Sequence, residues 1–224
     1  MSRYDDAWQE TDSERQGVAQ VYDRIARFYD LVTAPMEWMG GGRSRGRLMA
    51  RARGRVLEVG VGTGTNLRHY PAGVDLTGVD LSSRMLDRAR TRVDRLGLSV
   101  QLEQGDVEQL TFPDASFDTV TATCVFCSAG NPVQGLREVR RVTKPDGRVL
   151  LYEHVRPETR LLGNLFDLLT PLTRRLVGPS INRQTETNVR RAGLRITELR
   201  RRGIWREIVA VPEPSPSQYE PHWV

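Results

Sequence analysis

Lysine is almost absent from this 224-residue chain, because Lys144 is the only lysine among 33 basic residues and the rest are arginines. The formal net charge of +5 is compatible with an anionic partner such as a nucleic acid. The arginines, however, are spread along the chain without an aromatic-interleaved basic patch, and a codon bias would produce the same picture. We therefore expect no nucleic-acid partner.

Long hydrophobic runs are also absent, and we expect no secretory leader. No apolar run approaches the roughly 18 residues that a bilayer-spanning helix needs. The first 16 residues are polar and acidic, unlike a charged segment followed by an apolar one. The sequence therefore predicts a cytoplasmic protein, and its length predicts a single domain over residues 1–224.

Cysteine is scarce as well, with only Cys124 and Cys127 in a C-x-x-C arrangement. Their surroundings, "FDTVTATCVFCSAG", are typical of a buried strand that runs to Gly130. Residues three apart in a strand point to opposite faces, which disfavours a redox pair. A zinc site would lack its remaining ligands, so we expect no bound metal.

What the chain does contain is an alternation of strands and helices. Residues 14–50 favour a helical segment, with Val18, Val21, Ile25, Phe28 and Leu31 at helical spacing. Strands are then predicted at 55–60, 74–82, 99–106, 117–126 and 148–155, helices at 82–97, 133–147 and 183–193, and a terminal strand pair at 194–203 and 205–213. This order predicts an α/β fold with a seven-stranded, mostly parallel sheet, an antiparallel C-terminal hairpin and helices on both faces.

A glycine-rich turn follows the first predicted strand. The pattern is E-x-G-x-G-x-G, from Glu58 through Gly60 and Gly62 to Gly64. Glycines at a strand-to-helix turn allow unusual backbone angles and close approach of a ligand to the backbone. A dinucleotide fingerprint would need a glycine at position 65, which is threonine. The spacing therefore disfavours a dinucleotide.

The same glycine pattern resembles motif I of class I S-adenosylmethionine-dependent methyltransferases, which have a Rossmann-like fold. Further matches are Asp80 after the second strand, Asp106 after the third, "FPDASFD" and "LREVRRVTKPDGRVLL". The resemblance covers residues 55–155 and implies S-adenosylmethionine as cofactor. The cofactor-binding residues that it implies are Glu58, Gly60, Gly62, Gly64, Asn66, Asp80, Leu81, Met85, Gly105, Asp106, Val107, Thr123 and Tyr22.

The segments outside this core are expected to select the methyl acceptor. They are an N-terminal helical cap at 1–50, a lid insertion and helix at 156–193, and the hairpin and tail at 194–224. "VYDRIARFYDLV" resembles the entry of quinone C-methyltransferases and phospholipid N-methyltransferases, which implies that Tyr22 and Tyr29 face the cofactor or acceptor. Helix packing is the alternative role for both tyrosines.

Tyr29, Cys127 and His154 are the candidate catalytic residues. Cys127 stands where relatives often carry a histidine, and His154 ends the fifth strand, where a histidine suits proton removal. "CVFCSAGNP", "YEHV" and the Gly178, Asn182 and Thr185 positions also resemble mammalian methyltransferase-like thiol S-methyltransferases.

A broad leucine-rich helical face at residues 158–177 is compatible with a lipophilic acceptor or peripheral membrane contact, although packing of this helix on the sheet is the favoured role. The expected activity is therefore methylation of a small acceptor, either a thiol sulfur or a phospholipid amine. A quinone-ring carbon is the alternative acceptor, and a catalytically inactive cofactor-binding regulatory module is the alternative of another class. No obligate protein partner is evident.

Overall fold

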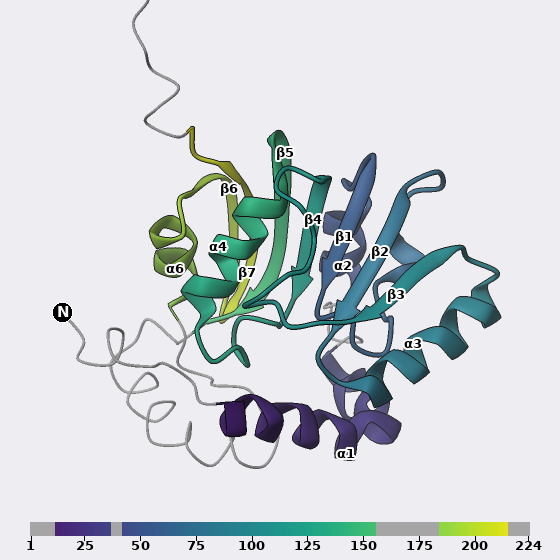
Figure 1. Ribbon diagram of the computed structural model, residues 1–224. Helices are drawn as coiled ribbons and strands as arrows, with labels where there is room; N and C mark the ends of the chain where they lie inside the picture. Colours follow the sequence, from purple (N-terminus) through teal and green to yellow (C-terminus); the bar gives the residue numbers. More distant parts are fainter. Residues whose placement is uncertain (1–11, 37–41, 156–183, 215–224) are drawn as a thin grey trace, which may run out of the picture.

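A seven-stranded sheet in the order β3-β2-β1-β4-β5-β7-β6 forms the centre of the computed structural model, which describes residues 12–36, 42–155 and 184–214 (Figure 1). Strands β1 to β5 are parallel, and β7 runs antiparallel to both β5 and β6. The strands are β1 Arg55–Val59, β2 Asp75–Asp80, β3 Val100–Gln104, β4 Phe117–Thr123, β5 Thr143–His154, β6 Leu194–Arg202 and β7 Trp205–Pro212. The predicted α/β class and the antiparallel terminal hairpin are confirmed.

Helices cover both faces of this sheet. They are α1 Asp12–Met36, α2 Gly42–Met49, α3 Ser83–Leu96, α4 Pro132–Val142 and α6 Thr185–Arg191, with a short 3-10 turn, η2, at Leu67–His69. Alternate residues of β1 face opposite sides, so Leu57 packs with Leu136 of α4 in one core, whereas Val56 packs with Leu48 of α2 in the other. The parallel strands are therefore buried on both faces.

The turn from β2 into α3 sets the position of Asp80, a predicted cofactor-binding residue. Ser82 caps α3, because its hydroxyl accepts a hydrogen bond from the Met85 backbone at 3.1 Å. Gly97 ends the helix in the left-handed conformation with φ of +62°. The sequence predicts a helix over 82–97, which agrees with these ends, and the Ser82 cap holds the chain directly after Asp80.

The fourth strand ends at Thr123 rather than continuing toward Gly130. Cys124 has φ of +54°, which takes the backbone out of the extended conformation. The Cys127 thiol then donates to the Cys124 carbonyl oxygen at 3.2 Å, so both cysteines belong to one turn. The prediction that they lie on opposite faces of a strand is wrong.

The helix predicted at 133–147 ends at Val142. A helix that continued through Pro145 would lose a backbone donor and place the proline ring against the Arg141 carbonyl. Residues Thr143 to Gly147 instead begin β5, which pairs with β4 through a register irregularity between Phe117 and Thr119.

Helix α1 lies below the carboxyl ends of the parallel strands and beside α3 (Figure 1). Its predicted apolar stripe does not pack throughout: Val21 is buried, but Phe28 is 52% exposed and Leu31 is 74% exposed. The predicted lid at 158–177 lies outside the described residues. Within the described ranges, no helix is long and apolar enough to cross a membrane.

Candidate active site

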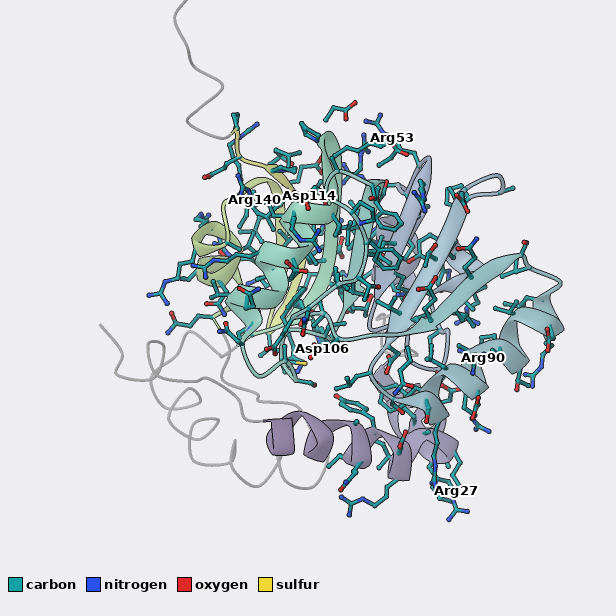
Figure 2. The ribbon with its side chains drawn as sticks, viewed as in Figure 1. Arg27, Arg53, Arg90, Asp106, Asp114 and Arg140 are labelled. Carbon is teal, nitrogen blue, oxygen red and sulfur yellow. The ribbon has the colours of Figure 1, made fainter. Side chains whose placement is uncertain are left out.

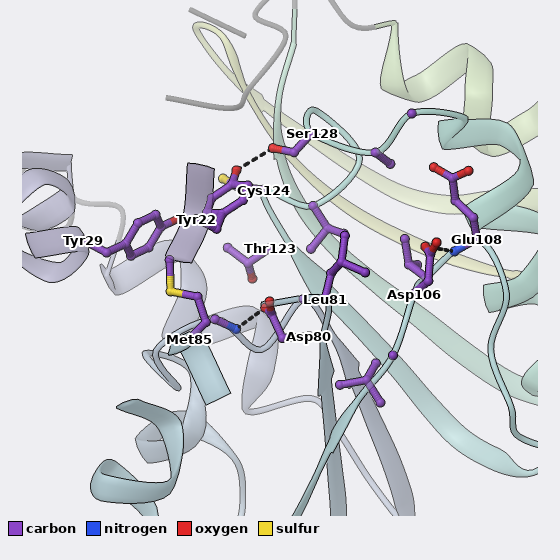
Figure 3. A pocket seen from close by; sticks show the side chains of 18 residues that line it. Tyr22, Tyr29, Asp80, Leu81, Met85, Asp106, Glu108, Thr123, Cys124 and Ser128 are labelled. Carbon is purple, nitrogen blue, oxygen red and sulfur yellow. Dashed lines mark hydrogen bonds between the residues drawn. The ribbon is translucent and has the colours of Figure 1, made fainter. Parts of the chain in front are cut away.

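A pocket lies between the carboxyl ends of β1 to β4 and helix α1, and together with its open mouth it encloses about 810 Å³. The predicted site residues that line it are Tyr22, Tyr29, Gly60, Gly62, Asp80, Leu81, Met85, Gly105, Asp106, Val107 and Thr123. Figure 3 shows the two tyrosines at one end, Asp106 and Glu108 at the other, and Asp80 between them.

The glycine turn after β1 requires glycine for two different reasons. Gly60 has φ of +63°, and a Cβ there would lie 2.3 Å from Cγ2 of Val125. Gly62 has φ of +56°, and a Cβ there would meet only the Gly60 carbonyl oxygen, at 4.0 Å. Gly60 therefore allows the close packing of the turn, and Gly62 leaves an open backbone surface that a ligand can approach.

The Asp80 carboxylate is oriented by backbone donors on both of its oxygens. Oδ2 accepts from the Gly62 amide at 2.8 Å, and Oδ1 accepts from the Ser82 amide at 2.9 Å. Burial raises the pKa of Asp80 to about 6, against the opposing effect of these hydrogen bonds. The carboxylate is therefore mostly ionised at neutral pH and has further lone pairs for a ligand.

The turn after β3 is held by its own carboxylates. Asp106 Oδ1 accepts from the Glu108 amide at 2.8 Å, and Glu108 Oε1 accepts from the Asn131 amide at 2.8 Å. Asn131 is in turn the N-cap of α4. Hydrogen bonds therefore connect the Asp106 end of the pocket to the N-terminus of α4.

Two tyrosines of α1 form the opposite end of the pocket. The hydroxyls of Tyr22 and Ser128 lie 2.6 Å apart, and the rings of Tyr22 and Tyr29 lie 6.2 Å apart at 59° (Figure 3). Burial raises the pKa of both phenols above the usual range. Both side chains therefore stay neutral and protonated across the physiological pH range.

Glu58, Gly64 and Asn66 do not line the pocket but lie behind its wall. Asn66 Nδ2 donates to Glu58 Oε1 at 2.6 Å and to Thr123 Oγ1 at 3.1 Å, and Arg45 donates to Asn66 Oδ1 at 3.0 Å. Burial raises the pKa of Glu58 to about 7. This network ties the residues before and after the glycine turn to each other and to the pocket-lining Thr123.

Two of the three candidate catalytic residues also lie off the pocket wall. Cys127 is fully buried behind Cys124 and Ser128. The His154 ring contacts Trp205 edge to face at 5.9 Å, and burial lowers its pKa to about 4. Of these candidates, Tyr29 alone lines the pocket.

Several lining residues were not anticipated from the sequence. They are Val79, Glu108, Cys124, Val125, Ser128, Ala129 and Gly130. Five of these seven follow β4, in the segment predicted as strand. A predicted strand end at Thr123 would have pointed to the residues of the following turn as pocket-lining. The residue types of that turn, however, are those of a buried strand.

The fold and pocket define a Rossmann-like protein with a small-molecule site at its strand ends, a glycine turn and two strand-end aspartates. Residues 57–151 match a family model described as a methyltransferase domain. The chain belongs to the class I S-adenosylmethionine-dependent methyltransferases.

Two similar proteins illustrate this membership, and one solved structure supports the fold. A phosphatidylethanolamine N-methyltransferase of Cereibacter sphaeroides is 38% identical over 63% of this chain and 70% of its own. A demethylmenaquinone methyltransferase of Deinococcus radiodurans is 36% identical over 68% of this chain and 66% of its own. The crystal structure of the YcgJ protein of Bacillus subtilis, 20% identical, covers 78% of this chain and 100% of its own with a TM-score of 0.63, and it supports the fold.

Proposed function

We propose that the pocket binds S-adenosylmethionine with its adenine toward Asp106, its ribose hydroxyls on Asp80 and its methionine portion along the glycine turn. The spatial order of these groups supports this orientation, since Asp80 lies between Asp106 and the tyrosine end (Figure 3). An oriented, ionised carboxylate suits a ribose diol, because it accepts charge-assisted hydrogen bonds. The open backbone at Gly62 leaves room for the ligand.

We propose that the acceptor is a phospholipid amine and that it binds at the end of the pocket formed by the two tyrosines of α1. Tyr22, Tyr29 and Ser128 present neutral hydroxyls and aromatic surface there. Aromatic faces attract an ammonium group, which is the form of the resting amine and of its methylated product. The amine gives its proton to water before its free nitrogen takes the methyl group from the sulfonium. The similarity to a phosphatidylethanolamine N-methyltransferase agrees with this acceptor class.

When bound, S-adenosylmethionine supplies an electrophilic methyl group on a sulfonium, and the acceptor takes it by in-line displacement. The contribution of this chain is to orient the reactants and exclude water. Tyr22 and Tyr29 cover the reacting end, and the hydrogen bond between Tyr22 and Ser128 joins α1 to the turn after β4. We assign no proton transfer to His154, because it lies off the pocket wall.

Binding of S-adenosylmethionine is expected to strengthen as the pH rises through about 6, the pKa to which burial raises Asp80. The ribose hydroxyls donate to the ionised carboxylate, and only about a tenth of it is ionised one unit below that pKa. Affinity at pH 5 should therefore be about tenfold weaker than at pH 7. Calorimetric titrations at pH 5, 6 and 7 measure this dependence.

Asp80→Asn is the control for that pH dependence. Its carboxamide does not titrate, so the pH dependence assigned to Asp80 should disappear in the variant. An affinity of the wild-type protein that is the same at pH 5 and pH 7 would contradict the ribose role. A slope that persists unchanged in the variant would assign the titration to another group.

A screen of acceptors tests the proposed substrate class. Release of S-adenosylhomocysteine is measured with phosphatidylethanolamine in detergent micelles, a prenylated naphthoquinol and an alkyl thiol. We expect turnover with the amine to exceed that with each other acceptor at least about tenfold, the effect of about 1.4 kcal/mol in the barrier. Reactions without acceptor provide the background.

The quinol is the second candidate, because the demethylmenaquinone methyltransferase of Deinococcus radiodurans is 36% identical to this chain. Turnover with the quinol and none with the amine would overturn the amine proposal and leave the cofactor site standing. Turnover with the thiol alone would overturn both. Binding of S-adenosylmethionine without turnover of any acceptor would favour a regulatory module.

A further inference from the structure

The outer face of α1 and the neighbouring start of α3 together form a basic surface with exposed apolar side chains. A cleft between the two helices is lined by Asp23, Arg24, Ala26, Arg27, Arg84 and Arg88. Beside it, Phe28 is 52% exposed and Leu31 is 74% exposed. We call the six residues Arg24, Arg27, Phe28, Leu31, Arg84 and Arg88 the outer basic face.

Helical spacing explains why the α1 part of this face is continuous. Arg24, Arg27, Phe28 and Leu31 are related by three, four and seven positions, which places them on one side of the helix. Tyr22 lies about half a turn away from Arg24 and lines the pocket. Figure 2 shows Arg27 pointing away from the sheet. One helix thus carries pocket residues on one side and the outer basic face on the other.

The charge of the face is not neutralised locally. Within the described ranges, none of its four guanidinium groups forms an ion pair. The carboxylate in the cleft, Asp23, accepts hydrogen bonds from the Ser82 hydroxyl and the Arg84 amide instead. The cleft therefore carries four positive charges against one negative charge.

The apolar side chains indicate which kind of anion this surface fits. The Arg27 guanidinium lies 4.8 Å from the centre of the Phe28 ring, so charge and aromatic surface are presented together. The exposed Leu31 side chain is aliphatic and has no hydrogen-bonding group. It therefore cannot form hydrogen bonds with the phosphates or bases of a nucleic acid. Arginines beside exposed Phe and Leu on a helix are typical of a surface that lies in a lipid headgroup region.

We propose that the outer basic face binds anionic phospholipid bilayers, with the arginines at the headgroups and Phe28 and Leu31 inserted among the acyl chains. An anionic leaflet attracts basic residues near its surface, and each buried apolar group adds to the binding. This inference goes beyond the acceptor assignment and does not depend on it, since binding to a bilayer requires no turnover. It places the membrane on the side of α1 that faces away from the pocket.

Flotation of the full chain with vesicles tests the proposal. Vesicles of phosphatidylcholine with 30% phosphatidylglycerol are compared with vesicles of phosphatidylcholine alone, at low and high salt. We expect binding to the anionic vesicles that falls steeply at high salt, and at least about tenfold weaker binding to the neutral ones. Equal binding to both vesicle types, or to neither, would overturn the proposal.

Paired variants separate the outer basic face from the general basicity of the chain. Arg24→Gln with Arg84→Gln should weaken binding by about 25-fold, at about fivefold for each arginine. The matched control is Arg195→Gln with Arg202→Gln, which removes the same charge from β6 at the opposite edge of the sheet and should change binding less than twofold. Equal losses in both pairs would reduce the effect to net charge and overturn the assignment.

A second pair tests the apolar contribution. Phe28→Ser with Leu31→Ser should weaken binding on the order of tenfold, whereas Leu96→Ser with Leu98→Ser, also exposed, should not. Melting curves and S-adenosylmethionine affinity confirm that each variant is folded. Tight binding of a single-stranded RNA that depends on the arginines, together with vesicle binding unaffected by Phe28→Ser and Leu31→Ser, would overturn the lipid assignment in favour of RNA.

Discussion

Asp80→Asn is expected to weaken S-adenosylmethionine binding by about 1–3 kcal/mol, the range for losing hydrogen bonds to a charged group. The carboxylate is oriented by the Gly62 and Ser82 amides, so its remaining lone pairs are positioned before the ligand arrives. The carboxamide keeps the size of the side chain but loses the charge and half of the acceptors. Isothermal titration calorimetry at pH 7 measures the change.

Asp75→Asn is the matched control for this substitution. Asp75 begins the same strand at the far end from the pocket, is 67% exposed, and lies 3.8 Å from the Arg55 guanidinium. Exposed ion pairs of this kind contribute little to stability, so the variant should remain folded. Because Asp75 is far from the pocket, we expect an affinity for S-adenosylmethionine within about twofold of the wild type. A wild-type affinity in Asp80→Asn would contradict the proposed ribose contact.

Gly60→Ala is expected to lower the free energy of unfolding by about 2–5 kcal/mol and to abolish measurable cofactor binding. Two costs add at this position. An alanine at φ of +63° is strained, and its Cβ would lie 2.3 Å from Cγ2 of Val125 on the turn after β4. Relief of this contact requires movement of the two turns that line the pocket. Chemical denaturation measures the stability, and calorimetry measures the affinity.

Two further variants separate strain from overlap. Gly73 has φ of +85°, and a Cβ there would meet no atom within 4 Å, so Gly73→Ala carries the backbone strain alone, about 1–2 kcal/mol. Adding Val125→Ala to Gly60→Ala should recover part of the lost stability, because it removes the methyl groups that the new Cβ meets. If Gly60→Ala costs no more than Gly73→Ala, the close packing of the two turns is not what requires glycine at position 60.

Local patterns were sufficient for most of the sheet and for the cap of α3. Short apolar or β-branched runs identified β1, β2 and β4, and the helix predicted at 82–97 agrees with α3 at both ends. The same patterns failed after Thr123, where β-branched and apolar residues form a turn. The residues of that turn are held by contacts with distant elements, such as the Glu153 carboxylate that accepts from the Val125 and Phe126 amides.

The sequence by itself determined the fold class and the resemblance to a methyltransferase, because strand periodicity, glycine spacing and strand-end aspartates are local features of the chain. The tertiary structure decided which side chains form the wall of the pocket. Tyr22 meets Ser128 across 106 positions of sequence, while Cys127 and His154 are placed off the wall. It also decided that Phe28 and Leu31 face outward and that burial raises the pKa of Asp80, since exposure and desolvation depend on what packs around a residue.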